Sequence, residues 1–159
     1  MFSFTCVWQK VGAQLRAEIM NFWEAHEALP LLADPEERAE ETVFIARTTG
    51  GEIAALCTAR ELYLKRFQNS FYFYRSMTSI VYRRKGLALD LLLRTRSFFE
   101  RRFTAGEGRG PIGLLIILEN PSIAKRFRVA METRTGFVFM GYNTKGHPIG
   151  VYYFKGATI

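Results

Sequence analysis

The feature that most limits the folds open to this chain lies in residues 70–93, where a strand-like run passes through a short basic segment into a helix-like pattern. Residues 70–81 are rich in aromatic and β-branched side chains and contain no proline, which predicts a long strand. From Leu87 to Arg102, leucine and phenylalanine recur at helical spacing among arginines. Between these two patterns lie Arg83, Arg84, Lys85 and Gly86. The sequence therefore predicts a strand, a basic loop and a helix, in that order.

This basic loop is a candidate site for an anion. The first backbone N–H groups of a helix have no partner within the helix, and the helix dipole adds partial positive charge there. Gly86 would let the backbone approach the anion without a Cβ in the way, and the three cations would add charge-assisted hydrogen bonds. The same residues also fit a solvated basic turn, because one glycine alone does not define a phosphate loop.

The run from Arg83 to Ala88 resembles the acyl-CoA pyrophosphate loop of the GNAT acyltransferase superfamily, in which Gln or Arg is followed by two residues, Gly, one residue, and Gly or Ala. In that superfamily the loop joins a central strand to a helix, and a strand, an Asn-led helix and a strand beginning with Gly-Phe come next. This chain has the same order, with an apolar run at 112–118, then Glu119-Asn120-Pro121, then Gly136-Phe137. The resemblance extends over residues 42–155.

The resemblance implies an α+β fold with a mixed, mostly antiparallel sheet of seven strands flanked by helices. The spacing of apolar residues and the turn residues in the first part of the chain agree with this α+β fold. They predict an opening strand at 2–8, a helix over 11–29 that ends at Pro30, and a short helix over 35–41 capped by Asp34. A hairpin is predicted from 42–47 and 52–60 around Gly50-Gly51.

The length of 159 residues predicts one domain spanning residues 1–159. The sequence contains neither GxGxxG nor GxxxxGK[ST], which argues against a doubly wound nucleotide-binding fold. Three consecutive strands ahead of the basic loop also favour α+β over that arrangement.

The resemblance further implies acetyl-CoA as the acyl donor. Backbone N–H groups of residues 84–88 would hold its pyrophosphate, with added charge from the side chains of Arg83 and Lys85. The pantetheine arm would pass the end of the central strand, and Asn120 matches the superfamily's Asn after the fifth strand, although Asn120-Pro121 is also a good helix start. The expected cofactor contacts are Ile80, Val81, Arg83, Arg84, Lys85, Gly86, Leu87, Ala88, Asn120, Ser122 and Lys125.

The implied reaction is the direct transfer of an acetyl group to a primary amine within a ternary complex. It needs an acid to protonate the leaving thiolate. Many members of the superfamily carry a Tyr about seven residues after the Asn, and here that position is Phe127. We expect Tyr142 to take this role, with Tyr152, Tyr153 or solvent as alternatives.

The reaction also needs a base for the amine proton and a hydrogen-bond donor for the thioester carbonyl. Glu119 is the first candidate base and Glu61 the second. The carbonyl donor would be a backbone N–H in the segment 78–80. His26 is expected to be an exposed helix residue and His147 a turn residue, since no nucleophile motif accompanies either.

The charge is unevenly distributed, with a net charge of −4 over residues 1–60 and +11 over the remainder. A basic C-terminal part suits an anionic ligand, either a phosphorylated cofactor or a nucleic acid. The aromatic run at 71–74 could stack bases, but aromatic side chains on both faces of a strand more often mean packing on both sides. The alternatives to an enzyme are therefore a catalytically inactive acyl-CoA-binding module and a basic nucleic-acid-binding protein.

Composition adds several expectations. Cys6 and Cys57 form no CxxC motif, so no metal site is expected and each is predicted to be a small buried hydrophobe. No apolar run reaches the ~20 residues of a membrane span, and the N-terminus has no basic leader, so we expect a soluble, cytoplasmic protein.

The acceptor could be a small-molecule amine or an amine of a protein or peptide. Aromatic strands near the C-terminus are compatible with a homodimer.

Overall fold

The computed structural model of this protein describes residues 1–29, 33–126 and 128–159. Pro30, which we expected to end the first helix, and Phe127, at the position of the superfamily's Tyr, lie outside the described residues. The chain divides into two compact units: the N-terminal unit contains residues 1–59 and 75–95, and the C-terminal unit contains residues 60–74 and 96–159. A single domain over the whole chain stays a prediction.

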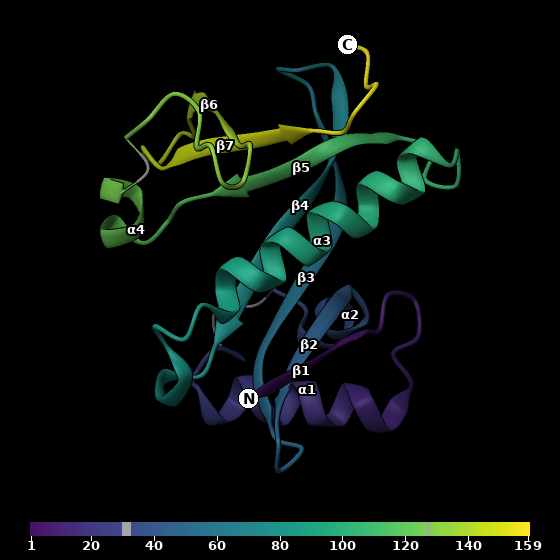
Figure 1. The fold of residues 1–159 in the computed structure, drawn as a ribbon, viewed down its shortest axis with the longest axis vertical. Coiled ribbons are helices and arrows are strands. Elements are labelled where there is room, and N and C mark those ends of the chain that lie inside the picture. Colours follow the sequence, from purple (N-terminus) through teal and green to yellow (C-terminus); the bar gives the residue numbers. More distant parts are fainter. Residues whose placement is uncertain (30–32, 127) are drawn as a thin grey trace. The chain divides into compact units, whose positions relative to one another are not determined.

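Seven strands form one sheet in the order β1-β2-β3-β4-β5-β7-β6 (Figure 1). Strands β4 and β5 are parallel, whereas the pairs β1–β2, β2–β3, β5–β7 and β6–β7 are antiparallel. This confirms the α+β fold class with a mixed, mostly antiparallel seven-stranded sheet. The strands are β1 (Phe2–Cys6), β2 (Thr42–Thr48), β3 (Ile53–Leu64), β4 (Asn69–Thr78), β5 (Pro111–Ile117), β6 (Val138–Tyr142) and β7 (Pro148–Tyr153).

The helices of the described residues lie in three places along the chain: between β1 and β2, between β4 and β5, and between β5 and β6. They are α1 (Ala13–Ala25), α2 (Pro35–Glu40), α3 (Leu87–Thr104), α4 (Pro121–Arg126) and the short 3-10 helix η2 (Ile80–Tyr82). None of the helices in the described part of the chain is long and apolar enough to cross a membrane.

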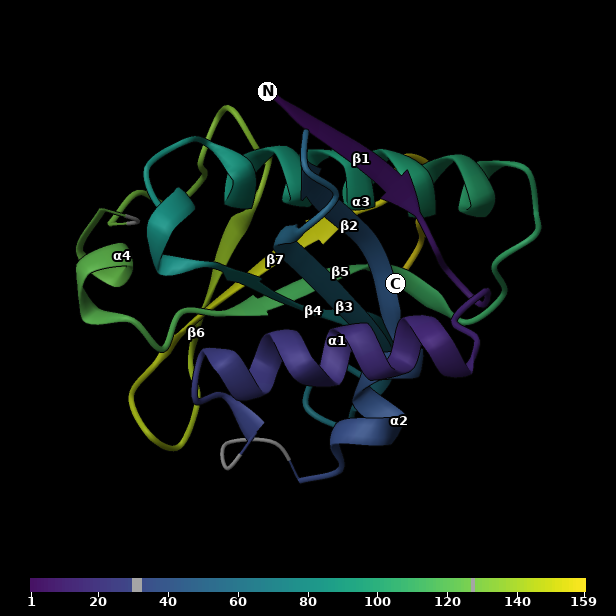
Figure 2. The same cartoon turned by 90° about the horizontal axis from the view of Figure 1, so that it is seen from below.

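In the N-terminal unit, α1 and α2 lie side by side in both ribbon views (Figures 1 and 2). Ile19, Phe22 and Trp23 of α1 are buried together with Ile45 of β2 and Leu56 of β3. Helix α2 begins as predicted: Oδ1 of its N-cap, Asp34, accepts the Glu37 N–H at 3.0 Å, and Pro35 occupies the first helical position.

The core of the C-terminal unit is built from β4, β5 and β7. Phe71, Phe73, Ile112, Leu115 and Val151 form its buried cluster. Strands β5 and β7 approach closely at one point, where a Cβ added to Gly113 would collide with the carbonyl oxygen of Tyr152. Such close pairing fixes where the ends of β5 and β7 lie, and the pocket described below is built on those ends.

Two predicted element boundaries are wrong in ways that affect the site. Strand β4 ends at Thr78 instead of continuing to residue 81, and β3 continues to Leu64 instead of ending at residue 60. After β4, the Ser79 N–H donates to the Ala54 carbonyl and the Tyr82 N–H donates to the Ser79 carbonyl, both at 2.9 Å. The first bond ties the end of β4 to β3, and the second closes η2. Composition alone does not distinguish such a turn from a strand.

The two cysteines differ in burial. Cys57 is fully buried, as expected for a small hydrophobe, and its thiol lies 3.2 Å from the Thr95 hydroxyl. Cys6 is only partly buried. Among the described residues no group of three or more His, Cys, Asp or Glu side chains is placed to hold a metal ion.

Candidate active site

The basic loop between β4 and α3 is anchored by a buried residue at each end. Ser79 and Leu87 are buried, whereas residues 83–86 between them are exposed. The Gly86 carbonyl accepts the first hydrogen bond of α3, from the Asp90 N–H at 3.0 Å. The N–H groups of residues 87–89 therefore have no acceptor within the helix and are available at its start.

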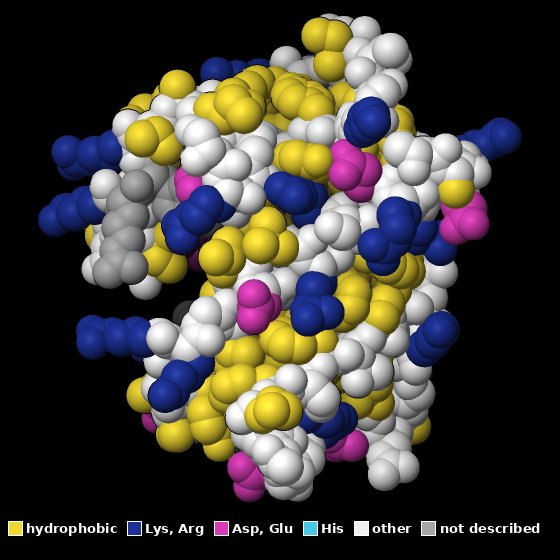
Figure 3. All heavy atoms as spheres, viewed as in Figure 1, with side chains coloured by type: hydrophobic (Ala, Val, Ile, Leu, Met, Phe, Trp, Pro, Cys, Tyr) yellow, Lys and Arg dark blue, Asp and Glu magenta, His cyan; other side chains and the backbone are white. Residues whose placement is uncertain are grey.

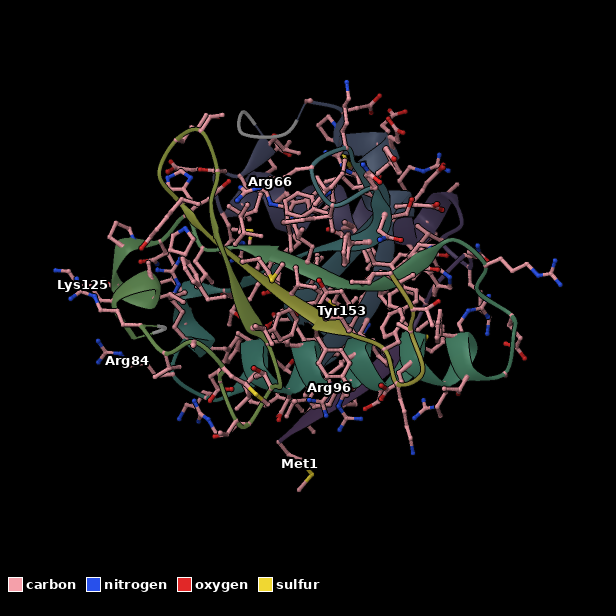
Figure 4. The ribbon with its side chains drawn as sticks, turned by 90° about the horizontal axis from the view of Figure 1, so that it is seen from above. Met1, Arg66, Arg84, Arg96, Lys125 and Tyr153 are labelled. Carbon is pink, nitrogen blue, oxygen red and sulfur yellow. The ribbon has the colours of Figure 1, made fainter. Side chains whose placement is uncertain are left out.

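Two residues of this loop have left-handed backbone conformations: φ is 67° at Arg84 and 81° at Gly86. A Cβ added to Gly86 would meet no atom within 4 Å. The backbone conformation, and not crowding by neighbouring atoms, is therefore what favours glycine at this position. In Figure 4 the side chain of Arg84 lies at the edge of the molecule.

The expectation that Ile80 and Val81 extend the central strand is wrong, because both lie in η2 and are exposed by 67% and 75%. The turn is held in place by Tyr82, whose ring meets that of Phe2 edge-on at 5.5 Å between centroids. Within the segment 78–80, where we expected the carbonyl donor, the Ser79 N–H is already bonded to Ala54. Contact of Ile80 and Val81 with a cofactor stays a prediction.

The C-terminal unit contains a pocket of about 700 Å³ at the ends of β5 and β7, next to α4 and the β6–β7 turn. Three residues expected in the site line it: Glu119, Lys125 and Tyr142. The other lining residues are mostly apolar, with a further cation and a histidine: Leu118, Pro121, Ala124, Arg128, Val129, Ala130, Phe139, Gly146, His147 and Pro148. The Leu118 N–H donates to the Pro148 carbonyl at 2.9 Å, which joins the two strand ends at the pocket.

Asn120 and Ser122 form the start of α4. Oδ1 of Asn120 accepts the Ser122 N–H at 2.9 Å, and the Asn120 carbonyl accepts the Ala124 N–H at 2.9 Å. Asn120 is thus the helix N-cap, with Pro121 in the first helical position as predicted. Lys125 lies on the same helix, and Figure 4 shows its side chain at the edge of the molecule.

Tyr142 is the one of the three candidate tyrosines that lines this pocket. Its ring meets that of Phe139 edge-on at 5.2 Å, and its side chain is 59% exposed. The Tyr152 hydroxyl instead donates to Glu100 Oε1 at 2.8 Å, and burial, together with that acceptor, raises the pKa of Tyr152. Tyr153 packs its ring against Phe71 in the core.

The two candidate bases lie at opposite ends of β5. Glu119 follows the C-terminal end of the strand, whereas the Glu61 carboxylate lies against Gly110, which directly precedes the strand. Seven residues of extended strand separate these ends by about 20 Å. Glu61 therefore does not belong to the pocket, while Glu119 does.

His147 is a pocket residue that was predicted only as a turn residue. Its backbone is indeed in the β6–β7 turn, but the residue also lines the pocket, and Nδ1 is buried without a hydrogen-bond partner in the part of the chain that the structure describes. The Gly146-His147-Pro148 motif predicts a turn and carries no signal for which way the imidazole points.

The aromatic strand β4 offers no open surface for stacking bases. Phe71, Phe73 and Tyr74 are buried, and the ring of Tyr72 is stacked on Phe99 at 3.9 Å. The expectation that this strand packs on both faces is confirmed. Base stacking by β4 would require these packed rings to separate, which weighs against a nucleic-acid platform here.

Neither a protein-family model nor a curated protein matches the sequence. Solved structures do match the fold. Arabidopsis thaliana NAA60 in complex with acetyl-CoA has a TM-score of 0.62 at 13% identity, covering 96% of this chain and 99% of that chain. An acetyltransferase of the GNAT family from Streptococcus pneumoniae has a TM-score of 0.60 at 15% identity, covering 95% and 96%.

A third similar structure, AtaTR bound with AcCoA, has a TM-score of 0.61 at 12% identity and covers 97% of this chain and 94% of that chain. Because the sequence identities are this low, the similarity to these structures shows the fold alone. The fold of this protein is that of the GNAT acetyltransferases.

Proposed function

We propose that this protein is an acetyl-CoA-dependent N-acetyltransferase that moves an acetyl group directly to a primary amine. The observation that carries the proposal is the loop between β4 and α3 on a GNAT fold. It combines a left-handed glycine, three exposed cations and the free N–H groups at the start of an eighteen-residue helix. Two similar structures were solved with acetyl-CoA.

The residues of this loop fit the pyrophosphate of acetyl-CoA chemically. Backbone N–H groups at 84–88 would donate to phosphate oxygens, and Arg83 and Lys85 would add charge-assisted hydrogen bonds. Acetyl-CoA supplies the acetyl group as a thioester. Asn120, Ser122 and Lys125 remain candidate contacts of the cofactor.

The pocket of the C-terminal unit supplies groups for the acceptor side of the reaction. Glu119 is the candidate base for the amine proton, and its carboxylate would also attract a positively charged amine, while the Tyr142 hydroxyl would protonate the leaving thiolate. These roles fit the position of the two residues in a pocket that is open to ligands of small-molecule size. The acceptor is a primary amine.

The decisive test is isothermal titration of the purified protein with acetyl-CoA. The Arg83→Ala plus Lys85→Ala double variant is expected to bind acetyl-CoA about tenfold or more weakly, because it loses two charge-assisted contacts. The matched control is Arg109→Ala plus Lys155→Ala, which removes the same charge at exposed positions of the C-terminal unit. Equal affinity in the two double variants would overturn the assignment of the loop.

The same preparation distinguishes the alternatives. Acetyl-CoA binding with no acetylated product from any amine tested by mass spectrometry indicates an inactive acyl-CoA-binding module. Salt-sensitive binding of a short oligonucleotide without acetyl-CoA binding indicates a nucleic-acid-binding protein, because displacement of counterions by phosphates makes such binding weaken with salt.

A further inference from the structure

His147 has an unusual combination of surroundings for a turn residue. Nδ1 is buried without a hydrogen-bond partner among the described residues. His147 nevertheless lines a pocket together with Glu119, which carries a carboxylate, and Tyr142, which carries a hydroxyl. A neutral imidazole carries one donor and one acceptor nitrogen, and Nδ1 of His147 is not committed to a partner in the described part of the protein.

The position of His147 is set by hydrogen bonds to its backbone, all from one residue. The His147 N–H donates to Asn143 Oδ1 at 2.8 Å, and the Asn143 N–H donates to the His147 carbonyl at 2.9 Å. The Lys145 N–H donates to the same Oδ1 at 3.0 Å. The turn therefore holds the base of the imidazole side chain in place before any ligand binds.

The charges around the pocket restrict the kind of amine that fits. The C-terminal unit contains 13 Lys and Arg residues and 5 Glu residues, a net charge of +8, and cationic side chains are prominent on the face seen in Figure 3. Two of the cations, Lys125 and Arg128, line the pocket itself. These positive charges would repel a polyamine, which carries several ammonium groups. The charge of a single ammonium group, in contrast, is balanced by the negative charge of Glu119.

The rest of the lining is apolar. Leu118, Val129, Phe139 and Pro148 contribute to it, and the pocket is far larger than one ammonium group needs. An acceptor with an apolar body would therefore bury that body against these side chains.

We infer that this pocket is the acceptor site of the proposed acetyltransferase, that it takes a primary monoamine carried on an apolar body, and that His147 accepts the proton of that amine. The inference rests on the proposed function for its acetyl donor, an acetyl thioester. It assigns the proton acceptor to His147 and leaves Glu119 the role of attracting the ammonium group.

The reaction balances with these groups. One proton passes from the ammonium nitrogen to the His147 imidazole, which frees the nitrogen lone pair. The nitrogen bonds to the acetyl carbonyl carbon, the C–S bond breaks, and the sulfur keeps the electron pair. The sulfur takes a proton from the Tyr142 hydroxyl, the resulting phenolate takes the second nitrogen proton, and the imidazole returns its proton to solvent.

The test compares two amines, phenethylamine as an apolar monoamine and spermidine as a polyamine, with acetyl-CoA as donor. We expect phenethylamine to be acetylated with the higher kcat/KM. The His147→Gln variant is expected to lose about 100-fold or more in kcat, the usual size of a general-base contribution. Glu119→Gln is expected to raise KM for the amine with a smaller effect on kcat.

Two measurements separate proton transfer from a structural role of His147. Added imidazole should partly restore the activity of His147→Ala, which a loss of folding would not allow. Asn143→Ala should lower kcat while keeping acetyl-CoA affinity, since it acts only by positioning the turn. Unchanged kcat in His147→Gln, or no rescue of His147→Ala by imidazole, overturns the role of His147.

A binding measurement without acetyl-CoA tests the pocket directly. The chain has two histidines, His26 and His147. Phenethylamine should shift one histidine ring signal in NMR spectra, and that signal should be missing in His147→Gln. His26, in the N-terminal unit with Nδ1 2.7 Å from the Phe22 carbonyl, serves as internal control.

The outcomes distinguish the failure of this inference from that of the proposed function. Acetyl-CoA binding with no acetylation of phenethylamine, or a preference for spermidine, overturns the inference and leaves cofactor binding standing. No acetyl-CoA binding overturns the proposed function, and a shifted His147 signal in that case still supports the pocket as an amine site. No shift of the His147 signal overturns the pocket assignment.

Discussion

Asn143 and His147 are bonded to each other in both directions across the β6–β7 turn. Asn143 Oδ1 accepts the His147 N–H at 2.8 Å, and the Asn143 N–H donates to the His147 carbonyl at 2.9 Å. The side chain and the backbone of Asn143 together close the turn that carries His147, a residue that lines the pocket of the C-terminal unit.

Asn143→Ala should destabilise the protein by about 1–2 kcal/mol, because two backbone N–H groups, of Lys145 and His147, lose their acceptor. Urea unfolding followed by circular dichroism measures the change. Asn143→Asp keeps an oxygen at the same position and is the matched control. If both variants lost the same stability, the accepted hydrogen bonds would not be the cause.

Gly86→Ala should lower the free energy of unfolding by about 1 kcal/mol, because φ at this position is 81° and L-residues are strained there. Gly50→Ala is the matched control: it also lies in a turn, its φ is not in the left-handed region, and an added Cβ would make only an ordinary contact with Thr48. Thermal or urea unfolding of both variants provides the comparison. Equal losses would contradict the backbone explanation.

Replacing each of two tyrosines by phenylalanine should affect different properties. Tyr142→Phe should lower turnover with phenethylamine and leave stability nearly unchanged, since Tyr142 is exposed and lines the pocket. Tyr152→Phe should keep turnover but cost about 1 kcal/mol of stability, because its hydroxyl loses Glu100 as acceptor. Turnover lost in Tyr152→Phe and kept in Tyr142→Phe would mean that the wrong tyrosine was assigned.

Stability should depend on pH through Glu132. The hydrogen bond from the Thr135 hydroxyl is the main reason why the pKa of Glu132 is lowered to about 2, with further contributions from the Thr135 N–H and Arg134. The unfolded chain, with an ordinary Glu pKa of about 4.3, binds the proton first as the pH falls. The stabilisation is therefore complete above about pH 5 and is lost progressively toward pH 2.

Urea unfolding between pH 6 and pH 3 checks this dependence. Glu132→Gln should show a shallower fall in stability than the parent protein, because one titrating group is gone. Thr135→Val, which removes the main hydrogen bond at a buried position of similar size, should do the same. If the free energy of unfolding fell with pH equally steeply in both variants and in the parent protein, other carboxylates would be the main cause of the loss of stability in acid.

Most of the fold could be predicted because it follows from local patterns. The helical spacing of Ile19, Phe22 and Trp23 and the cap at Asp34 reappear in the structure as predicted. The predicted end of β4 was wrong because the residues that follow this strand have side chains that suit either a strand or a turn. Residues 80–82 have the composition of a strand, but the Tyr82 N–H bonds to the Ser79 carbonyl and closes a 3-10 turn there.

The candidate site could be predicted only in part. The position of the loop from Arg83 to Ala88, between a strand and a helix, could be predicted because the basic segment is visible in the sequence itself, and its binding of a cofactor stays a prediction. Choosing among candidates was harder. The sequence offered two bases and three tyrosines, and only the folded chain shows that Glu119 and Tyr142 share a pocket while Glu61 lies at the far end of β5.

The sequence by itself determined the order of the elements, the capped start of α2 and the basic loop with its glycine, because each depends on interactions within a few residues of the chain. Only the tertiary structure decided that His147 lines the pocket with Glu119 and Tyr142. These three residues come from two segments of the chain, and the antiparallel pairing of β5 and β7 brings those segments together. No local pattern encodes which side chains such long-range pairing places next to one another.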